Sequence, residues 1–200
     1  MQEYGVKVIA FECRCGLINN LKIFKIQEGR WCQMSKRIRQ YMGIIVAIVV
    51  YYIIHEGAHL VVAFFFHAFK KIKFMEIIGI QVDIYRDRLI NGQLGVFCIA
   101  GAVATLLAAY ILVYLKDRIC SIKSKILKAI LYYVTLTMLL LDPIYLCLLS
   151  GWLGGGDLNG ILYLMPQGGV WTLFGLILIY NLWLLIKKVT PVYSAAFNEN

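Results

Sequence analysis

Two histidines and a glutamate, His55, Glu56 and His59, interrupt an otherwise apolar run over residues 43–66. Residues four positions apart on a helix lie on one face, so both imidazoles can bind the same ion. Glu56 would lie about 100° around the helix from His55, where its carboxylate can reach a water molecule held by that ion. Two imidazoles with a neighbouring carboxylate are typical of zinc hydrolases, in which the bound water has a pKa of about 7.

The setting of these residues favours a functional interpretation. Ionisable side chains are costly within a segment long enough to cross a bilayer, and those that occur there usually serve a function. The chain has only three histidines, and two of them belong to this motif. The third, His67, follows at the end of the apolar run, and we interpret it as an interfacial side chain rather than a ligand.

A divalent ion needs a third protein ligand, and two other carboxylates lie within or beside the apolar stretches. Asp157 follows three glycines, which permit close approach to another helix, and it is the predicted third ligand. Its alternative role is to cap the helical run that follows it. Asp142 precedes a proline and is the alternative third ligand. It could instead bind backbone groups freed by the proline, or orient a ligand histidine.

The composition predicts a membrane protein. Hydrophobic residues make up 61% of the 200 residues and charged residues only 16%, whereas about a quarter of a typical soluble domain is charged. A membrane-spanning helix needs about 20 apolar residues. Such runs occupy 43–66, 93–115, 129–152 and 158–186. Pro166 and a Gly-Gly pair interrupt the last run, which is either one broken span or a short half-helix followed by a span over 170–186.

We therefore predict an α-helical, multi-pass integral membrane protein with about four transmembrane segments and a small strand-containing loop after the first. Residues 1–40 are interpreted as a basic, mixed cap segment, 41–188 as the membrane-embedded core and 189–200 as a C-terminal tail. Anionic lipid headgroups account for the net charge of +9, so the bilayer is the expected partner and nucleic acid is not. The six cysteines lack paired Cys-x-x-Cys spacing, and we interpret most of them as small core residues.

The polar loop after the first apolar run contains a predicted strand. Ile80, Val82 and Ile84 alternate with polar residues or tyrosine, the period of a half-buried strand. An open strand edge beside a catalytic helix could bind an extended peptide through backbone hydrogen bonds. The alternative is a hairpin that merely packs against the protein.

The sequence His55-Glu56-Gly57-Ala58-His59 on a first apolar helix, with a glycine-flanked aspartate about a hundred residues later, resembles the site-2 protease family of intramembrane zinc metalloproteases. The likeness covers roughly residues 43–186. It implies that His55, His59 and Asp157 bind zinc, that Glu56 activates water, and that a strand-like loop over 80–85 helps to present the substrate. Small residues at 100–102 are similar to a motif in the family's second core helix.

The aspartate motif departs from the family's usual Leu-Asp-Gly. Here the choices are Leu141-Asp142-Pro143 and Gly156-Asp157-Leu158, so the chain looks like a divergent, minimal member. The sequence thus predicts a zinc-dependent membrane endopeptidase acting on transmembrane or membrane-proximal segments of other proteins. Alternatives are a non-catalytic protein with a structural metal site, a pseudo-protease that binds partner helices, and a membrane metallohydrolase acting on lipids or prenylated proteins.

Overall fold

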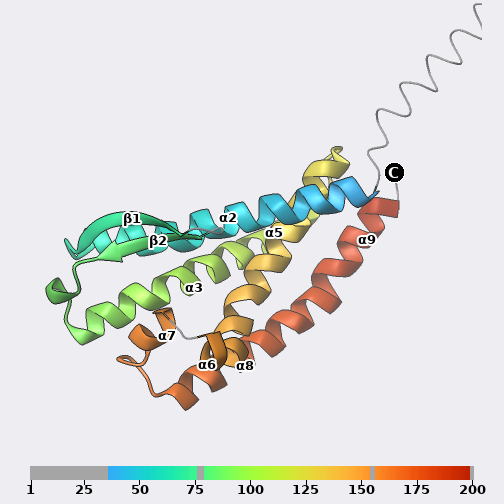
Figure 1. Ribbon diagram of the computed structural model, residues 1–200. Coiled ribbons are helices and arrows are strands. Elements are labelled where there is room, and N and C mark those ends of the chain that lie inside the picture. Colours follow the sequence, from blue (N-terminus) through green and yellow to red (C-terminus); the bar gives the residue numbers. More distant parts are fainter. Residues whose placement is uncertain (1–35, 76–78, 154–155, 199–200) are drawn as a thin grey trace, which may run out of the picture. The chain divides into compact units, whose positions relative to one another are not determined.

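The structure, a computed structural model, describes residues 36–75, 79–153 and 156–198. The chain divides into two compact units, Met1–Arg39 and Gln40–Asn200. The predicted cap segment therefore lies, except for its last residues, outside the described part. The second unit contains the helices and strands of Figure 1 that build the site.

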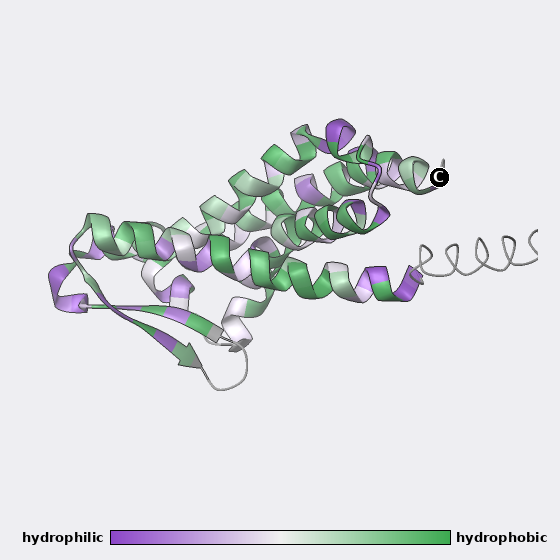
Figure 2. Cartoon of the chain, turned by 90° about the horizontal axis from the view of Figure 1, so that it is seen from above, coloured by the Kyte–Doolittle hydropathy of each residue, from purple (hydrophilic) through white to green (hydrophobic). Residues whose placement is uncertain are grey.

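Within the described residues, four helices are long and apolar enough to cross a membrane, as the apolar runs predict. They are α2 (Lys36–Phe65), α3 (Asn91–Tyr114), α5 (Lys125–Ile144) with its continuation through η2 (Tyr145–Leu149) and α6 (Ser150–Leu153), and α8 (Gln167–Leu184) with its continuation through η3 (Leu185–Val189) and α9 (Thr190–Asn198). Figure 2 shows hydrophobic residues along these helices and hydrophilic ones gathered at helix ends and on the hairpin.

The predicted strand-containing loop is present after the first long helix. Strands β1 (Phe69–Met75) and β2 (Gly79–Ile84) form an antiparallel pair, in which Ile72 lies opposite Val82. His67, two residues after the end of α2, has a positive φ of 53°, a left-handed conformation common just after a helix. A short turn η1 (Arg86–Arg88) then leads into α3, and α4 (Lys116–Cys120) links α3 to α5.

The fourth apolar stretch adopts the second of its two predicted forms. A short helix, α7 (Gly156–Ile161), is followed by a turn and then by α8, which begins after Pro166. Proline has no backbone N–H and is therefore suited to the start of a helix. The segment interpreted as a C-terminal tail is helical as far as Asn198.

A proline also lies inside α5, and the structure compensates for it. Pro143 has no N–H to donate to the carbonyl of Leu139, four residues earlier. The Asn181 side chain on α8 donates to this carbonyl instead, over 2.6 Å, and accepts a hydrogen bond from the Tyr110 hydroxyl on α3. One fully buried amide therefore joins three helices at the point where the proline interrupts the hydrogen bonding of α5.

One row of residues on α2 faces the rest of the unit. Its buried positions recur every four residues: Gly43, Ala47, Tyr51, His55, His59 and Ala63. Such i, i+4 rows are the ridges by which helices pack. Most members of the row are small or apolar, so the two histidines lie in the packed face of α2.

Candidate metal centre

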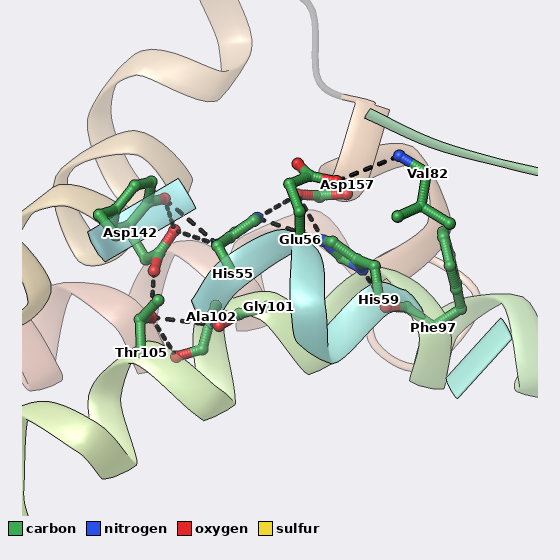
Figure 3. A network of polar contacts seen from close by, with 11 residues as sticks. His55, Glu56, His59, Val82, Phe97, Gly101, Ala102, Thr105, Asp142 and Asp157 are labelled. Atoms are coloured by element: carbon green, nitrogen blue, oxygen red, sulfur yellow. Dashed lines mark hydrogen bonds and ion pairs between the residues drawn. The ribbon is translucent and has the colours of Figure 1, made fainter. Parts of the chain in front are cut away.

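Three side chains converge at the middle of this packed face. The Nε2 atoms of His55 and His59 are 3.2 Å apart, and Oδ2 of Asp157 lies 3.4 Å from the first and 3.7 Å from the second. Figure 3 shows the two imidazoles from α2 and the carboxylate from α7 pointing toward one another. The described part of the chain brings together these three potential ligands and no fourth His, Cys, Asp or Glu.

Two glycines allow the helices that carry the site to come close together. A Cβ atom at Gly101 of α3 would lie 2.6 Å from Nε2 of His55 and 2.7 Å from Nε2 of His59. Gly160 of α7 lies against Cys98 of α3, and a Cβ there would also be 3.3 Å from the carbonyl oxygen of Leu94. Close packing at Gly160 holds α7 against α3, and this places Asp157 over the histidines.

The proton on His59 is located by its neighbour. Nδ1 of His59 lies 2.7 Å from the carbonyl oxygen of Phe97. A carbonyl oxygen can only accept, so Nδ1 must donate, and in the neutral imidazole Nε2 is left with its lone pair facing the site.

His55 has the same arrangement with different partners. Its Nδ1 lies 3.3 Å from Oδ1 of Asp142 and 3.2 Å from the Tyr51 hydroxyl. That hydroxyl donates its proton to Oδ1 of Asp142 over 2.6 Å, so both groups near Nδ1 are acceptors for it. The Thr105 hydroxyl contacts the other carboxylate oxygen, Oδ2. Asp142, the alternative third ligand, thus lies behind His55 and outside the group of three.

The converging atoms form a site suited to a cation. With both Nδ1 atoms donating, two imidazole nitrogens and a carboxylate oxygen meet as acceptors, so a proton or a metal ion must lie between them. Ligand bonds of about 2.0–2.1 Å to a tetrahedral ion imply ligand-to-ligand distances of about 3.3 Å. The observed distances of 3.2, 3.4 and 3.7 Å are close to this value. The three residues could therefore hold one metal ion.

The charge of Asp157 agrees with this role. Burial raises the pKa of its carboxyl, but the hydrogen bond with His55 and the contact with His59 outweigh burial and lower the pKa below its usual range. This lowering depends on positive charge between Asp157 and the histidines, and the ionised carboxylate is the form that binds a metal ion. Asp157 is the second residue of α7, so it lies inside the first turn and not at the N-cap position before the helix.

Glu56 lies beside the three ligands without joining them. It is partly buried, and its Oε2 accepts a hydrogen bond of 3.2 Å from the backbone N–H of Val82 on β2. Figure 3 shows this contact on the same side of α2 as Asp157. The backbone N–H of Val82 thus binds the carboxylate that is expected to move protons.

An open cavity of about 500 Å³ adjoins the three ligands and Glu56. Of the strand residues predicted to contact a substrate, Ile80 and Val82 line it, whereas Ile84 packs in the hydrophobic core nearby. The remaining wall is largely aromatic and aliphatic, and it includes Tyr52, Leu141, Tyr145 and Leu149.

Several groups around the histidines and around Asp142 have no direct sign in the sequence. Tyr51 was detectable in principle, because it precedes His55 by four residues and so shares its helix face. Thr105 and the Phe97 carbonyl lie on α3, and no local pattern marks them. His67 and the described cysteines do not join the group.

In comparisons with known proteins, the chain matches no family model, no curated protein and no solved structure.

Proposed function

We propose that the protein is an integral membrane zinc endopeptidase that cleaves peptide bonds within or near transmembrane segments of other membrane proteins. The observation that carries the proposal is the convergence of His55, His59 and Asp157 beside Glu56, at the wall of an open cavity. The resemblance of His55-Glu56-Gly57-Ala58-His59 to the site-2 protease family supports the choice of reaction.

The donor set suits zinc. Two neutral imidazoles and one carboxylate are common ligands of catalytic zinc, which keeps a position open for water or substrate. A structural zinc site would be closed by a fourth protein ligand, and the described residues offer only three. This difference favours a catalytic centre over the structural alternative. When bound, zinc supplies a Lewis acid that polarises a carbonyl group and lowers the pKa of water to about 7.

Glu56 is the general base in this proposal. Its carboxylate is too far around the helix to share the ion easily with His55, yet Glu56 lines the same cavity as the three ligands. It takes a proton from the attacking water and delivers it to the leaving amine, which lets one residue serve both proton transfers of peptide hydrolysis.

The cavity supports a peptide as the substrate. The N–H of Val82 points away from β1 to Glu56, so the outer edge of β2 faces the site, where an extended chain can pair with it. The aliphatic and aromatic wall suits apolar side chains such as those of a membrane-spanning segment. A helical substrate must unwind locally before its amide groups can form such hydrogen bonds.

The decisive experiment compares purified wild type with Glu56→Gln, which keeps the size of the side chain but removes its charge. Both are reconstituted in liposomes with a panel of single-span membrane proteins, zinc is measured by elemental analysis, and fragments are identified by mass spectrometry. We expect both proteins to contain zinc and only wild type to cleave. Asp117→Asn, at an exposed carboxylate on α4, is the matched control and should cleave like wild type.

Cleavage by Glu56→Gln at the wild-type rate would refute the catalytic role of Glu56. Zinc retained at full stoichiometry in Asp157→Ala would refute Asp157 as a ligand. A wild-type protein that binds zinc tightly but cleaves nothing, with a fourth ligand found by X-ray absorption spectroscopy, would favour the structural site instead.

A further inference from the structure

We propose that Asp142 is a positioning residue for the metal centre: it fixes the His55 imidazole so that Nε2, and not a ring N–H, faces the ion. The inference rests on the proposed metal centre but concerns a residue outside the group of three ligands. It assigns a function to a buried carboxylate that the proposed reaction does not itself use.

Asp142 has an unusual environment for a carboxylate. It lies on α5, only 2% exposed, in a helix apolar enough to span a membrane. An ionised carboxylate is very costly to bury unless donors surround it. Oδ1 accepts from the Tyr51 hydroxyl and faces Nδ1 of His55, while Oδ2 faces the Thr105 hydroxyl. Donors from α2 and α3 thus converge on one side chain of α5.

The Thr105 hydroxyl has more acceptors than protons. It lies 3.2 Å from the carbonyl of Gly101 and 3.0 Å from that of Ala102, and it is closer still to Oδ2 of Asp142. A hydroxyl has one proton, and a carboxylate is a stronger acceptor than a carbonyl already bonded within a helix. The proton therefore points to Asp142, and Figure 3 shows contacts from Thr105 and from His55 meeting at this carboxylate.

The other role expected for Asp142, binding a backbone group freed by the proline, does not apply. The freed group is a carbonyl oxygen, and an ionised carboxylate cannot donate a hydrogen bond to it. The carbonyl freed by Pro143 belongs to Leu139, and the Asn181 side chain binds it. The Asp142 oxygens are thus left for the two hydroxyls and the imidazole.

Fixing the imidazole matters because His55 can otherwise expose either ring nitrogen. A flip of the ring or a change of tautomer would put an N–H into the group of ligands, where it could not bind a metal. His59 is held by the Phe97 carbonyl, a backbone acceptor that substitution cannot remove. His55 depends on side chains: its Nδ1 is hydrogen-bonded to the Tyr51 hydroxyl and lies 3.3 Å from Oδ1 of Asp142, and Asp142 in turn fixes that hydroxyl by accepting its proton. Ligand histidines are commonly held in this way by a carboxylate behind them, and loss of such a partner typically costs about 10–100-fold in metal affinity.

The test measures Co²⁺ affinity, with cobalt as the spectroscopic probe for the zinc site, in the purified protein in detergent micelles. Asp142→Asn should weaken Co²⁺ binding roughly 10–100-fold and change the visible absorption of the bound ion. Thr105→Val is the matched control, because it removes another hydrogen bond of Asp142 without touching His55. It should lower the unfolding temperature but leave most of the Co²⁺ affinity.

A double-mutant cycle separates positioning from a general effect on the fold. In a His55→Ala background, Asp142→Asn should change the remaining Co²⁺ affinity by less than about twofold, because its partner is already gone. In a His59→Ala background the full loss should persist. If Asp142→Asn does not fold, Asp142→Glu replaces it, since an added methylene moves the carboxylate away from Nδ1 and should also weaken binding.

Three results would overturn the inference. They are unchanged Co²⁺ affinity in folded Asp142→Asn or Asp142→Glu, an equal loss in the His55→Ala background, and a loss in Thr105→Val as large as that in Asp142→Asn. Wild type that binds no Co²⁺ would instead overturn the metal centre on which the inference rests, so the two failures are distinguishable.

Discussion

Gly101 offers the sharpest test of the site geometry. Its ideal Cβ position lies 2.6 Å from both Nε2 and Cε1 of His55 and 2.7 Å from Nε2 of His59, whereas ordinary contacts of a Cβ begin at 3.4 Å. In Gly101→Ala the shortest contact rises from 2.6 to 3.4 Å only if α3 or the imidazoles move by about 0.8 Å. Metal–ligand distances tolerate only about 0.2 Å, so this movement is enough to disturb the centre.

The cost of the methyl group can appear in two ways. If the helices stay in place, overpacking lowers the free energy of unfolding by about 1–3 kcal/mol. If the imidazoles move instead, metal affinity falls by a comparable free energy, roughly 5–150-fold at 1.4 kcal/mol per factor of ten. The loss in free energy of unfolding and the loss in free energy of metal binding should therefore add up to at least about 1 kcal/mol.

Gly57→Ala is the matched control. Gly57 lies on α2 between the two histidines, and a Cβ there meets nothing within 4 Å. Alanine is a better helix former than glycine by about 1 kcal/mol, so this variant should be as stable as wild type or more stable, with unchanged metal affinity.

The assay combines thermal unfolding of the metal-free protein in detergent with Co²⁺ titration of the same samples. If Gly101→Ala leaves both the unfolding temperature and the Co²⁺ affinity within the error of wild type, the close approach of α3 to the imidazoles is refuted. If Gly57→Ala weakens Co²⁺ binding as much as Gly101→Ala, the effect cannot be assigned to contact with the histidines.

Three further predictions follow from the packing around the site. Gly160→Ala should push α7 away from α3 and weaken Co²⁺ binding at least about tenfold, whereas Gly156→Ala, where a Cβ meets nothing within 4 Å, should bind like wild type; equal affinities would contradict the role of the α7 contact. Asn181→Leu should lower the free energy of unfolding by about 1–3 kcal/mol for each group left unpaired, and an unchanged denaturation midpoint would refute its role as the partner of the Leu139 carbonyl. Removal of bound metal by a chelator should lower the unfolding temperature of wild type, because a ligand at 100 times its Kd stabilises by about 2.7 kcal/mol. The same chelator should leave Asp157→Ala unaffected, and an equal shift in that variant would place the metal elsewhere.

Several features of the fold could be predicted because they depend on neighbouring residues. The length of each apolar run sets whether a helix can cross a bilayer, and the four long helices of the structure confirm this expectation. The alternation at Ile80, Val82 and Ile84 predicted a strand, and β2 lies there. Length and composition alone could not decide whether the fourth apolar stretch, residues 158–186, is one broken span or a half-helix followed by a span.

The composition of the site was predictable only in part. The spacing of His55 and His59 determines by itself that both imidazoles share a helix face, since the period of a helix is fixed by its backbone hydrogen bonds. The position of Glu56 relative to them follows from the same geometry. These three residues therefore required no knowledge of the rest of the chain.

Which aspartate faces the histidines could not be deduced from the sequence, because Asp142 and Asp157 belong to elements whose positions depend on helix packing. The close approach at Gly101 and Gly160 brings Asp157 over the Nε2 atoms, and the packing of α5 places Asp142 on the Nδ1 side of His55. The sequence by itself determined two histidines on one helix face that could hold a metal ion, and a glutamate beside them. Only the tertiary structure decided which carboxylate completes the group of three and which lies behind it, because contacts between residues about a hundred positions apart arise from packing and not from local backbone geometry.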